Sequence, residues 1–190
     1  MSVMKLPKIV RAKIDETIAA EGGAKVTNDP ADRGGLTKWG ITQATWAAFR
    51  EPSWPTNVAD STNEQAVELY AKRYWIAPSF DEIFNVSAAL AFEMFDWGVT
   101  SGPARPAQAL QRALNVLNTQ GADYPDIAAD GVLGALSLAA LNKFAVRRGA
   151  DGMCYLLDMV QSLRRVFYIE IAERDKTQER FENGWQGRIK

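Results

Sequence analysis

The chain of 190 residues contains no histidine and a single cysteine, Cys154. Without histidine, Ser-His-Asp and Cys-His catalytic sites and histidine-ligated zinc sites are excluded. Acid and base chemistry near neutral pH must therefore come mainly from carboxylates. A lone cysteine cannot form an intrachain disulfide, so we expect the chain to fold in a reducing compartment, with Cys154 as a small buried apolar side chain.

A strong net charge and a long apolar run are also missing. The 22 Lys and Arg residues nearly balance the 23 Asp and Glu residues, which leaves a formal net charge of −1 and no overall basic field for binding nucleic acid. The opening residues contain no apolar run long enough for a signal peptide or a membrane anchor, so we expect no stable membrane insertion. The hydrophobic content of 47% is sufficient for a packed core.

Periodic apolar residues and capping signals predict a mainly helical domain. Val10, Ile14 and Ile18 recur every four residues, which is typical of a helix with one buried face. Thr62 followed by Gln65 three residues later resembles a capping box at a helix start. The expected helices cover residues 8–21, 42–50, 62–75, 88–97, 104–117, 135–147 and 151–176, and the tail 181–188 is expected to form a short docked helix or turn.

Two segments between these helices are rich in turn residues. Residues 22–41 contain Gly22-Gly23 and Gly34-Gly35, so we predict a small irregular β-hairpin or compact loop there. Residues 118–134 contain Asp130-Gly131, whose surroundings offer too few oxygen ligands for calcium. That second segment is therefore predicted to be a tight turn leading into a capped helix, and we predict no metal site and no cofactor.

The residues best suited to chemistry lie where the first helix gives way to the glycine-rich segment. Glu21 stands at that helix end, where burial would favour the protonated carboxyl that a leaving-group oxygen needs. Asp29 and Asp32 are the two candidates for a second carboxylate, which would activate water or offset positive charge on a sugar ring. Asp29 also fits a simple turn, and Asp32 also fits a surface ion pair.

Several neighbours of these carboxylates are candidates for supporting roles. Thr37 could hydrogen-bond an attacking water, and Gly35 could allow a close approach of the backbone to substrate. Trp39 is the best candidate for stacking on a sugar ring, because it lies beside the loop. The other tryptophans considered are expected to pack in the core: Trp46, Trp54, Trp75 and Trp97.

Over nearly its whole length, the sequence resembles glycoside hydrolase family 108, the phage and prophage endolysins and bacterial secretion-associated muramidases. The resemblance is carried by Glu21-Gly22-Gly23, by Asn28-Asp29-Pro30 and by the run from Gly34 to Thr42. It continues through Leu69-Tyr70-x-x-Arg73-Tyr74-Trp75, Phe95-Asp96-x-Gly98-Val99-x-Ser101-Gly102-Pro103, Gln111-Arg112-Ala113-Leu114, Asp130-Gly131-Val132-Leu133-Gly134 and Gly184-Trp185-x-x-Arg188. The later blocks resemble a segment described as a predicted peptidoglycan domain.

The resemblance implies a lysozyme-like helical fold and hydrolysis of the β-1,4 bond between N-acetylmuramic acid and N-acetylglucosamine in peptidoglycan glycan strands. It assigns the catalytic acid to Glu21 and, through phage-type lysozymes, a trio of Glu21, Asp32 and Thr37, although the spacing differs and Asp29 stays an alternative. Substrate binding is expected at Asp29, Gly35 and Trp39. Inversion is favoured over retention, because the second carboxylate is expected on a hairpin across a cleft.

Other functions remain open at this stage. A lytic transglycosylase, a chitinase-like hydrolase and a non-catalytic peptidoglycan-binding protein are the alternatives. We expect a monomeric single domain over residues 1–190, with a catalytic head at about 1–95 and a helical part at about 96–190. If the protein is an endolysin, it is expected to stay in the host cytoplasm until a holin-type pore gives access to the periplasm and the cell wall.

Overall fold

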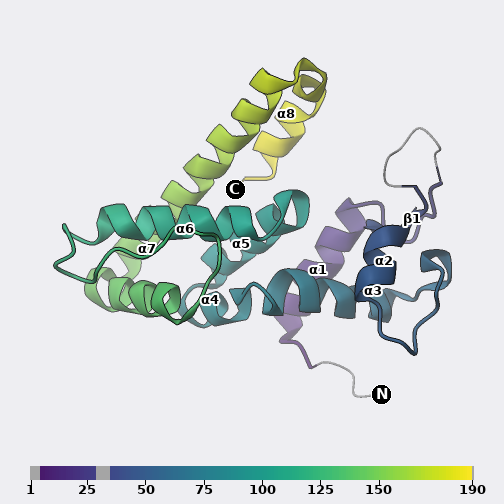
Figure 1. Ribbon diagram of the computed structural model, residues 1–190, viewed down its shortest axis with the longest axis horizontal. Helices are drawn as coiled ribbons and strands as arrows, with labels where there is room; N and C mark the ends of the chain where they lie inside the picture. The colour runs from purple at the N-terminus through teal and green to yellow at the C-terminus, as the bar shows by residue number, and fades with distance from the viewer. Residues whose placement is uncertain (1–4, 29–34, 190) are drawn as a thin grey trace. The chain divides into compact units, whose positions relative to one another are not determined.

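Helices dominate the computed structural model, which describes residues 5–28 and 35–189 (Figure 1). A two-stranded antiparallel sheet lies near the N-terminus, so the prediction of a mainly helical fold with a small hairpin is confirmed. The chain divides into two compact units, Met1–Ala77 and Pro78–Lys190, which we describe in turn. The prediction of a single domain over residues 1–190 stays a prediction.

The first unit is built on α1 (Lys8–Ala20), which begins after Pro7. Val10, Ile14 and Ile18 on this helix are almost completely buried, as their spacing predicts. Alpha helix α1 packs against α3 (Asn63–Tyr70), whose capping box between Thr62 and Gln65 is present as predicted. The remaining elements of the unit are β1 (Thr37–Lys38), β2 (Ile41–Thr42), α2 (Gln43–Phe49), the 3₁₀ turn η1 (Val58–Asp60) and the π-helical turn η2 (Ala71–Ile76).

Tryptophans fill much of the core of this unit. Trp46 is fully buried and stacks on Trp54 with ring centroids 5.3 Å apart, and Trp75 is also buried. The indole N–H of Trp46 donates to the carbonyl of Pro55 at 2.7 Å, so burial leaves no unsatisfied donor there. The expectation that these tryptophans serve packing is confirmed, and it also holds for Trp97 in the second unit.

The second unit is helical throughout its described residues. It contains α4 (Phe80–Val86), α5 (Ala88–Ser101), α6 (Ala104–Leu117), α7 (Ala135–Arg174), the 3₁₀ turn η3 (Lys176–Gln178) and α8 (Glu179–Gly187). The Ser87 hydroxyl caps α5 as expected, but the helix continues four residues beyond the predicted end at 97. Helix α4 was not predicted from the sequence, since its seven residues are too few to establish a helical period.

Helix α7 consists of two limbs that meet at Gly149. This residue has φ 61° and ψ −156°, a conformation that favours glycine and interrupts the helix. The two limbs run in different directions in Figure 1, and α8 lies along the second one. The prediction of two helices at 135–147 and 151–176 is therefore confirmed, and so is the docked helix in the tail, where Trp185 stacks on Tyr168 at 5.1 Å.

The turn before α7 is a hydrogen-bonded loop, as predicted for Asp130-Gly131. A carboxylate oxygen of Asp130 accepts from the backbone N–H of Val132 at 2.9 Å, and the Gln111 amide donates to the same oxygen at 3.0 Å. These hydrogen bonds, the one from Val132 first, lower the pKa of Asp130 below its usual value. The expectation of a capped helix was wrong, because Gly134 at the N-cap offers no side chain.

The prediction that Cys154 is buried was wrong, because the side chain is exposed. The buried positions on the second limb of α7 follow every fourth residue, and Cys154 falls two residues after Gly152, on another face of the helix. That buried line is Gly152, Leu156, Val160, Arg164, Tyr168 and Ala172. The apolar residues next to Cys154 in the sequence therefore did not predict whether its side chain is buried.

A charged cluster lies at the centre of the second unit. Arg164 is fully buried, and its guanidinium donates to Glu93 at 2.7 Å and to Asp96 at 2.6 Å, both on α5. Arg188 donates to the other oxygen of Asp96 at 2.9 Å. Burial alone would raise the pKa of Asp96, but the hydrogen bonds from Arg188 and Arg164 lower it below its usual value. The cluster therefore holds ionised side chains in the interior.

No helix among residues 5–28 and 35–189 combines the length and the apolar composition needed to cross a membrane.

Candidate active site

Glu21 is held at the point where α1 ends. Its backbone N–H donates to the carbonyl of Thr17 at 3.0 Å, and the N–H of Gly23 donates to that of Ile18 at 2.9 Å. Gly22 and Gly23 have φ of 107° and 56°, which explains why two glycines follow the glutamate. The Glu-Gly-Gly sequence thus stops the helix and leaves Glu21 half-buried at its last turn.

The hairpin turns through two residues, Trp39 and Gly40. Strand β1 pairs with β2 so that Lys38 faces Ile41, and the turn residues have φ of 60° and 72°. Positive φ at both positions is the geometry of a type I′ turn, which matches the twist of a hairpin. Glycine adopts it readily, but tryptophan does so at a cost, and a residue held in such a conformation is a reason to suspect function.

Three hydrogen bonds hold Trp39 in this conformation. Its backbone N–H donates to the carbonyl of Gly23 at 2.9 Å, and its carbonyl accepts from the Tyr70 hydroxyl at 3.1 Å. The indole N–H donates to the carbonyl of Ser61 at 3.4 Å. The hairpin turn is therefore fastened both to the loop that follows Glu21 and to α3.

Gly40 brings the turn directly against Glu21. A Cβ atom built on Gly40 would lie 2.6 Å from the Cβ of Glu21 and 2.7 Å from the Tyr70 hydroxyl oxygen. Neither approach is possible for a residue with a side chain, so only glycine permits this packing. The turn, the glutamate and the Tyr70 hydroxyl consequently meet at one place.

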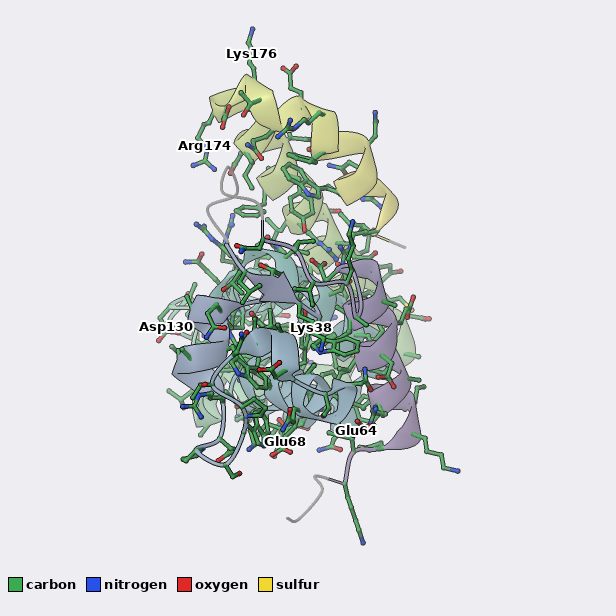
Figure 2. The ribbon with its side chains drawn as sticks, turned by 90° about the vertical axis from the view of Figure 1, so that its right-hand side faces the viewer. Lys38, Glu64, Glu68, Asp130, Arg174 and Lys176 are labelled. Carbon is green, nitrogen blue, oxygen red and sulfur yellow. The ribbon has the colours of Figure 1, made fainter. Side chains whose placement is uncertain are left out.

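Lys38 ties the hairpin to the segment around η1. The side chain of Lys38 is labelled in Figure 2. Its ammonium donates to the carbonyls of Ala59 at 2.7 Å and Ser61 at 2.8 Å, and it lies 5.3 Å from the ring centre of Trp39. Two carbonyl acceptors and an aromatic face satisfy the cation without a carboxylate. The side chain therefore holds the hairpin against the segment around η1.

Thr37 and Gly35 lie at the base of the hairpin. The backbone of Thr37 pairs with that of Thr27 through two hydrogen bonds of 2.9 and 2.8 Å, and its hydroxyl donates to the carbonyl of Gly35 at 3.1 Å. Gly35 has φ of 60°, and a Cβ there would meet no atom within 4 Å. The hydroxyl of Thr37 keeps its acceptor capacity, since it serves as the donor in this bond.

Asp29 and Asp32, the two candidates for a second carboxylate, lie outside the described residues. Their roles, and those of Gly35, Thr37 and Trp39 toward a substrate, stay predictions. In the part of the chain that the structure describes, no group of three or more Asp, Glu and Cys side chains is arranged to hold a metal ion.

Sequence reasoning did not identify Gly40, Tyr70 and Lys38 as parts of this arrangement. A signal for Gly40 was present, because Trp39-Gly40 lies between residues typical of strands and a glycine there favours a tight turn. Tyr70 belongs to one of the blocks that carried the family resemblance, but nothing local relates it to Trp39. Lys38 carried no signal that separates it from any other exposed lysine.

Comparisons with known proteins find two family models that match this chain. Residues 14–102 match the family model for glycosyl hydrolase 108, and residues 105–190 match the model for a predicted peptidoglycan domain. The chain carries a glycosyl hydrolase family 108 domain. Glu21 and the hairpin fall inside that domain, and the family implies glycosidase activity. Helices α6, α7 and α8 fall inside the predicted peptidoglycan domain.

The chain is also similar in structure to SagA from Brucella abortus. The TM-score is 0.66 and the sequence identity 26%, over 96% of this chain and 91% of that one. The comparison with curated proteins finds no match. The resemblance to family 108 that the sequence motifs carried is confirmed for residues 14–102, and that of the later blocks to a predicted peptidoglycan domain is confirmed for residues 105–190.

Proposed function

We propose that the chain is a muramidase that hydrolyses the β-1,4 bond between N-acetylmuramic acid and N-acetylglucosamine in peptidoglycan. Glu21 donates a proton to the glycosidic oxygen as the sugar leaves. The observation that carries the proposal is the packing of the hairpin turn on Glu21, because Gly40 leaves no room for a Cβ between them. The two family domains, glycosidase and peptidoglycan, support the choice of substrate.

The geometry suits a general acid for a physical reason. A catalytic carboxyl must stay at one position while the substrate binds, since small displacements reduce the rate strongly. Here the helix end is closed by two glycines, and the turn beside it is fastened by hydrogen bonds from Trp39 to Gly23 and from Tyr70 to Trp39. Trp39 bonds to Gly23, two residues after the acid, and its indole face could stack on a sugar ring.

The second carboxylate of the proposed mechanism is Asp32, with Asp29 as the alternative. Asp32 activates a water molecule on the opposite face of the sugar, Thr37 orients that water, and Asp29, Gly35 and Trp39 bind the glycan. This arrangement leads to inversion, for which carboxyl groups about 6.5–9.5 Å apart leave room for water.

Analysis of the products from purified sacculi tests the proposal. A muramidase releases fragments that end in a reducing N-acetylmuramic acid, whereas a lytic transglycosylase releases an anhydro-sugar end. Mass spectrometry before and after borohydride reduction distinguishes the two. Products of the second kind, or binding without any release of fragments, would replace the proposal by one of these alternatives.

The variant Glu21→Gln tests the role of Glu21 as the general acid. We expect its rate of hydrolysis to fall by about 10²- to 10⁴-fold, the usual contribution of a positioned general acid. Glu16→Gln on the same helix is the control, because Glu16 is exposed and forms a surface ion pair with Lys13 at 3.2 Å. Circular dichroism shows whether both variants fold. A Glu21→Gln enzyme with near-normal activity would remove Glu21 from the mechanism.

The endolysin role belongs to the same proposal. The enzyme waits in the host cytoplasm, and a holin-type pore lets it reach the periplasm and the cell wall. Expression in a bacterial host with and without such a pore tests this. Lysis that requires the pore supports the role, and equally rapid lysis without it contradicts the role.

A further inference from the structure

A cleft in the second unit lies between α6 and the second limb of α7. Its volume is about 140 Å³, and Trp97 of α5 contributes to its wall. Its charged side chains are Arg105 and Arg112 on α6 and Glu170 on α7. No ion pair within 4 Å involves either arginine among the described residues. The cleft thus presents two arginines that form no ion pair with a described carboxylate, beside the single carboxylate of Glu170.

The exposed side chain of Arg105 lies over an aromatic ring. Its guanidinium carbon lies 5.1 Å from the ring centre of Phe167, which in turn packs on Trp97 with ring centroids 5.7 Å apart. Stacking on an aromatic face fixes the plane of a guanidinium and leaves its N–H groups free at the edge. That edge is the surface with which arginine binds a carboxylate through two parallel hydrogen bonds.

The indole N–H of Trp97 is an independent indication that the cleft binds a ligand. Its indole Nε1 is buried and has no hydrogen-bond acceptor in the described structure. A buried donor without an acceptor is uncommon and costs free energy. By contrast, the indole N–H groups of Trp46 and Trp39 each reach a backbone carbonyl.

An apolar hollow continues the cleft along α6 and α7. It has a volume of about 290 Å³ and shares Arg112 and Leu163 with the cleft. Val116 on α6 and Met159 on α7 line it, and Val116 is 74% exposed. An exposed valine beside a cation-lined cleft gives the surface a charged end and an apolar end.

We propose that this groove binds the stem peptide of peptidoglycan, with a peptide carboxylate at Arg105 and Arg112. Aliphatic side chains of the peptide cover Val116 and Met159, and Glu170 receives a free ammonium group. A glycan strand without peptides carries the lactyl carboxylate of its N-acetylmuramic acid, but it has no aliphatic side chains and no free ammonium group, so the peptide is the part of the polymer that fits all three features of the groove. The inference rests on the proposed function, because it takes peptidoglycan as the substrate.

Binding to sacculi by the full-length Glu21→Gln protein tests the inference. One sample keeps its stem peptides, and the other has lost them by amidase digestion. We expect binding to be about tenfold weaker or more without the peptides, and Arg112→Gln to lower binding to intact sacculi by a similar factor, since charge-assisted hydrogen bonds between arginine and a carboxylate are stronger than neutral ones. Lys143→Gln is the control, because Lys143 is an exposed cation on the first limb of α7.

A second measurement detects binding of the peptide in the groove. In a ¹⁵N–¹H spectrum, the purified tetrapeptide should shift the Trp97 indole signal, and the same peptide with amidated carboxyl groups should not. Equal binding to both kinds of sacculi, or an unmoved Trp97 signal at saturating peptide, overturns the inference and leaves the muramidase proposal intact. Failure to bind or digest any peptidoglycan would overturn both.

Discussion

The two units of this chain use charged side chains in opposite ways. In the first unit, Glu21 lies half-buried at a helix end, and the groups around it are held by backbone hydrogen bonds and by a glycine contact. In the second unit, Arg164 is fully buried and is held by ion pairs with Glu93 and Asp96. A carboxyl group at a surface loop can exchange protons with a substrate, whereas ionised groups in a core serve to neutralise one another.

The two units also differ in the kind of energetic cost that their structures carry. Conformational cost in the first unit is concentrated at Trp39, with its positive φ beside the candidate acid. Desolvation cost in the second unit is concentrated at Arg164, where two carboxylates and the Tyr168 hydroxyl offset it. Substitutions in the first unit should therefore reduce activity more than stability, and those in the second the reverse.

The largest effect on stability is expected from Arg164→Met. It leaves Glu93 and Asp96 buried without their central partner, and breaking a buried pair costs about 3–5 kcal/mol. Denaturant unfolding measures the loss. Arg147→Met is the control, because Arg147 pairs with Asp123 while 68% exposed and should cost less than about 1 kcal/mol. Equal losses in both variants would abolish the distinction between the units.

Gly40→Ala should cost less stability than Arg164→Met, but it should reduce the rate of hydrolysis more. The positive φ costs alanine about 1–2 kcal/mol, and the new Cβ must displace Glu21, which lies 2.6 Å from it. A displacement of about 1 Å at a catalytic group can cost about 10²-fold in rate. Gly121→Ala is the control, because φ there is 83° but no atom lies within 4 Å of the added Cβ.

If the two glycine variants lose equal stability but only Gly40→Ala loses activity, the contact with Glu21 is functional. Equal activities would mean that the hairpin turn does not position the acid. Initial rates on sacculi and unfolding curves for both variants give the comparison.

A smaller effect is expected from Thr37→Val. The change removes a hydroxyl that donates to Gly35 at 3.1 Å, which should cost about 0.5–1.5 kcal/mol of stability. If Thr37 also orients the attacking water, kcat should fall by about tenfold, while Thr37→Ser should restore it. Normal kcat in the valine variant would limit Thr37 to a structural role.

The smallest effect is a pH dependence specific to the second unit. The pKa of Asp96 is lowered in the folded protein, so its ion pairs stabilise the fold above the unfolded value of about 3.9. That stabilisation should be lost as the pH falls through the lowered pKa. Unfolding free energies measured downward from about pH 5 should decrease more steeply for the wild type than for Asp96→Asn. Parallel slopes would contradict the assignment.

Local patterns in the sequence were sufficient for most helices. The four-residue spacing of Val10, Ile14 and Ile18 and the capping box at Thr62 each act over one or two turns, so they can be recognised without a structure. Glu21 was located in the same way, by the two glycines that end its helix. Helix α4 and the exposure of Cys154 were missed, because a short helix and an apolar stretch carry little periodic information.

Contacts between distant residues could not be predicted by this reasoning. Tyr70 bonds to Trp39 across 31 positions, and Arg164 bonds to Glu93 across 71. Arg164 did carry one signal, since it occupies a position in the buried line of α7 where an apolar residue would be expected. That signal says that a partner must exist, but it does not say which carboxylates supply it.

By itself the sequence excluded histidine-based catalysis and located most of the helices, because the lack of histidine is a fact of composition and the glycines and capping residues act locally. Only the tertiary structure decided that Gly40 lies against Glu21 and that Arg164 is neutralised in the core. Both depend on packing between segments far apart in the chain, where steric fit and desolvation select the partners.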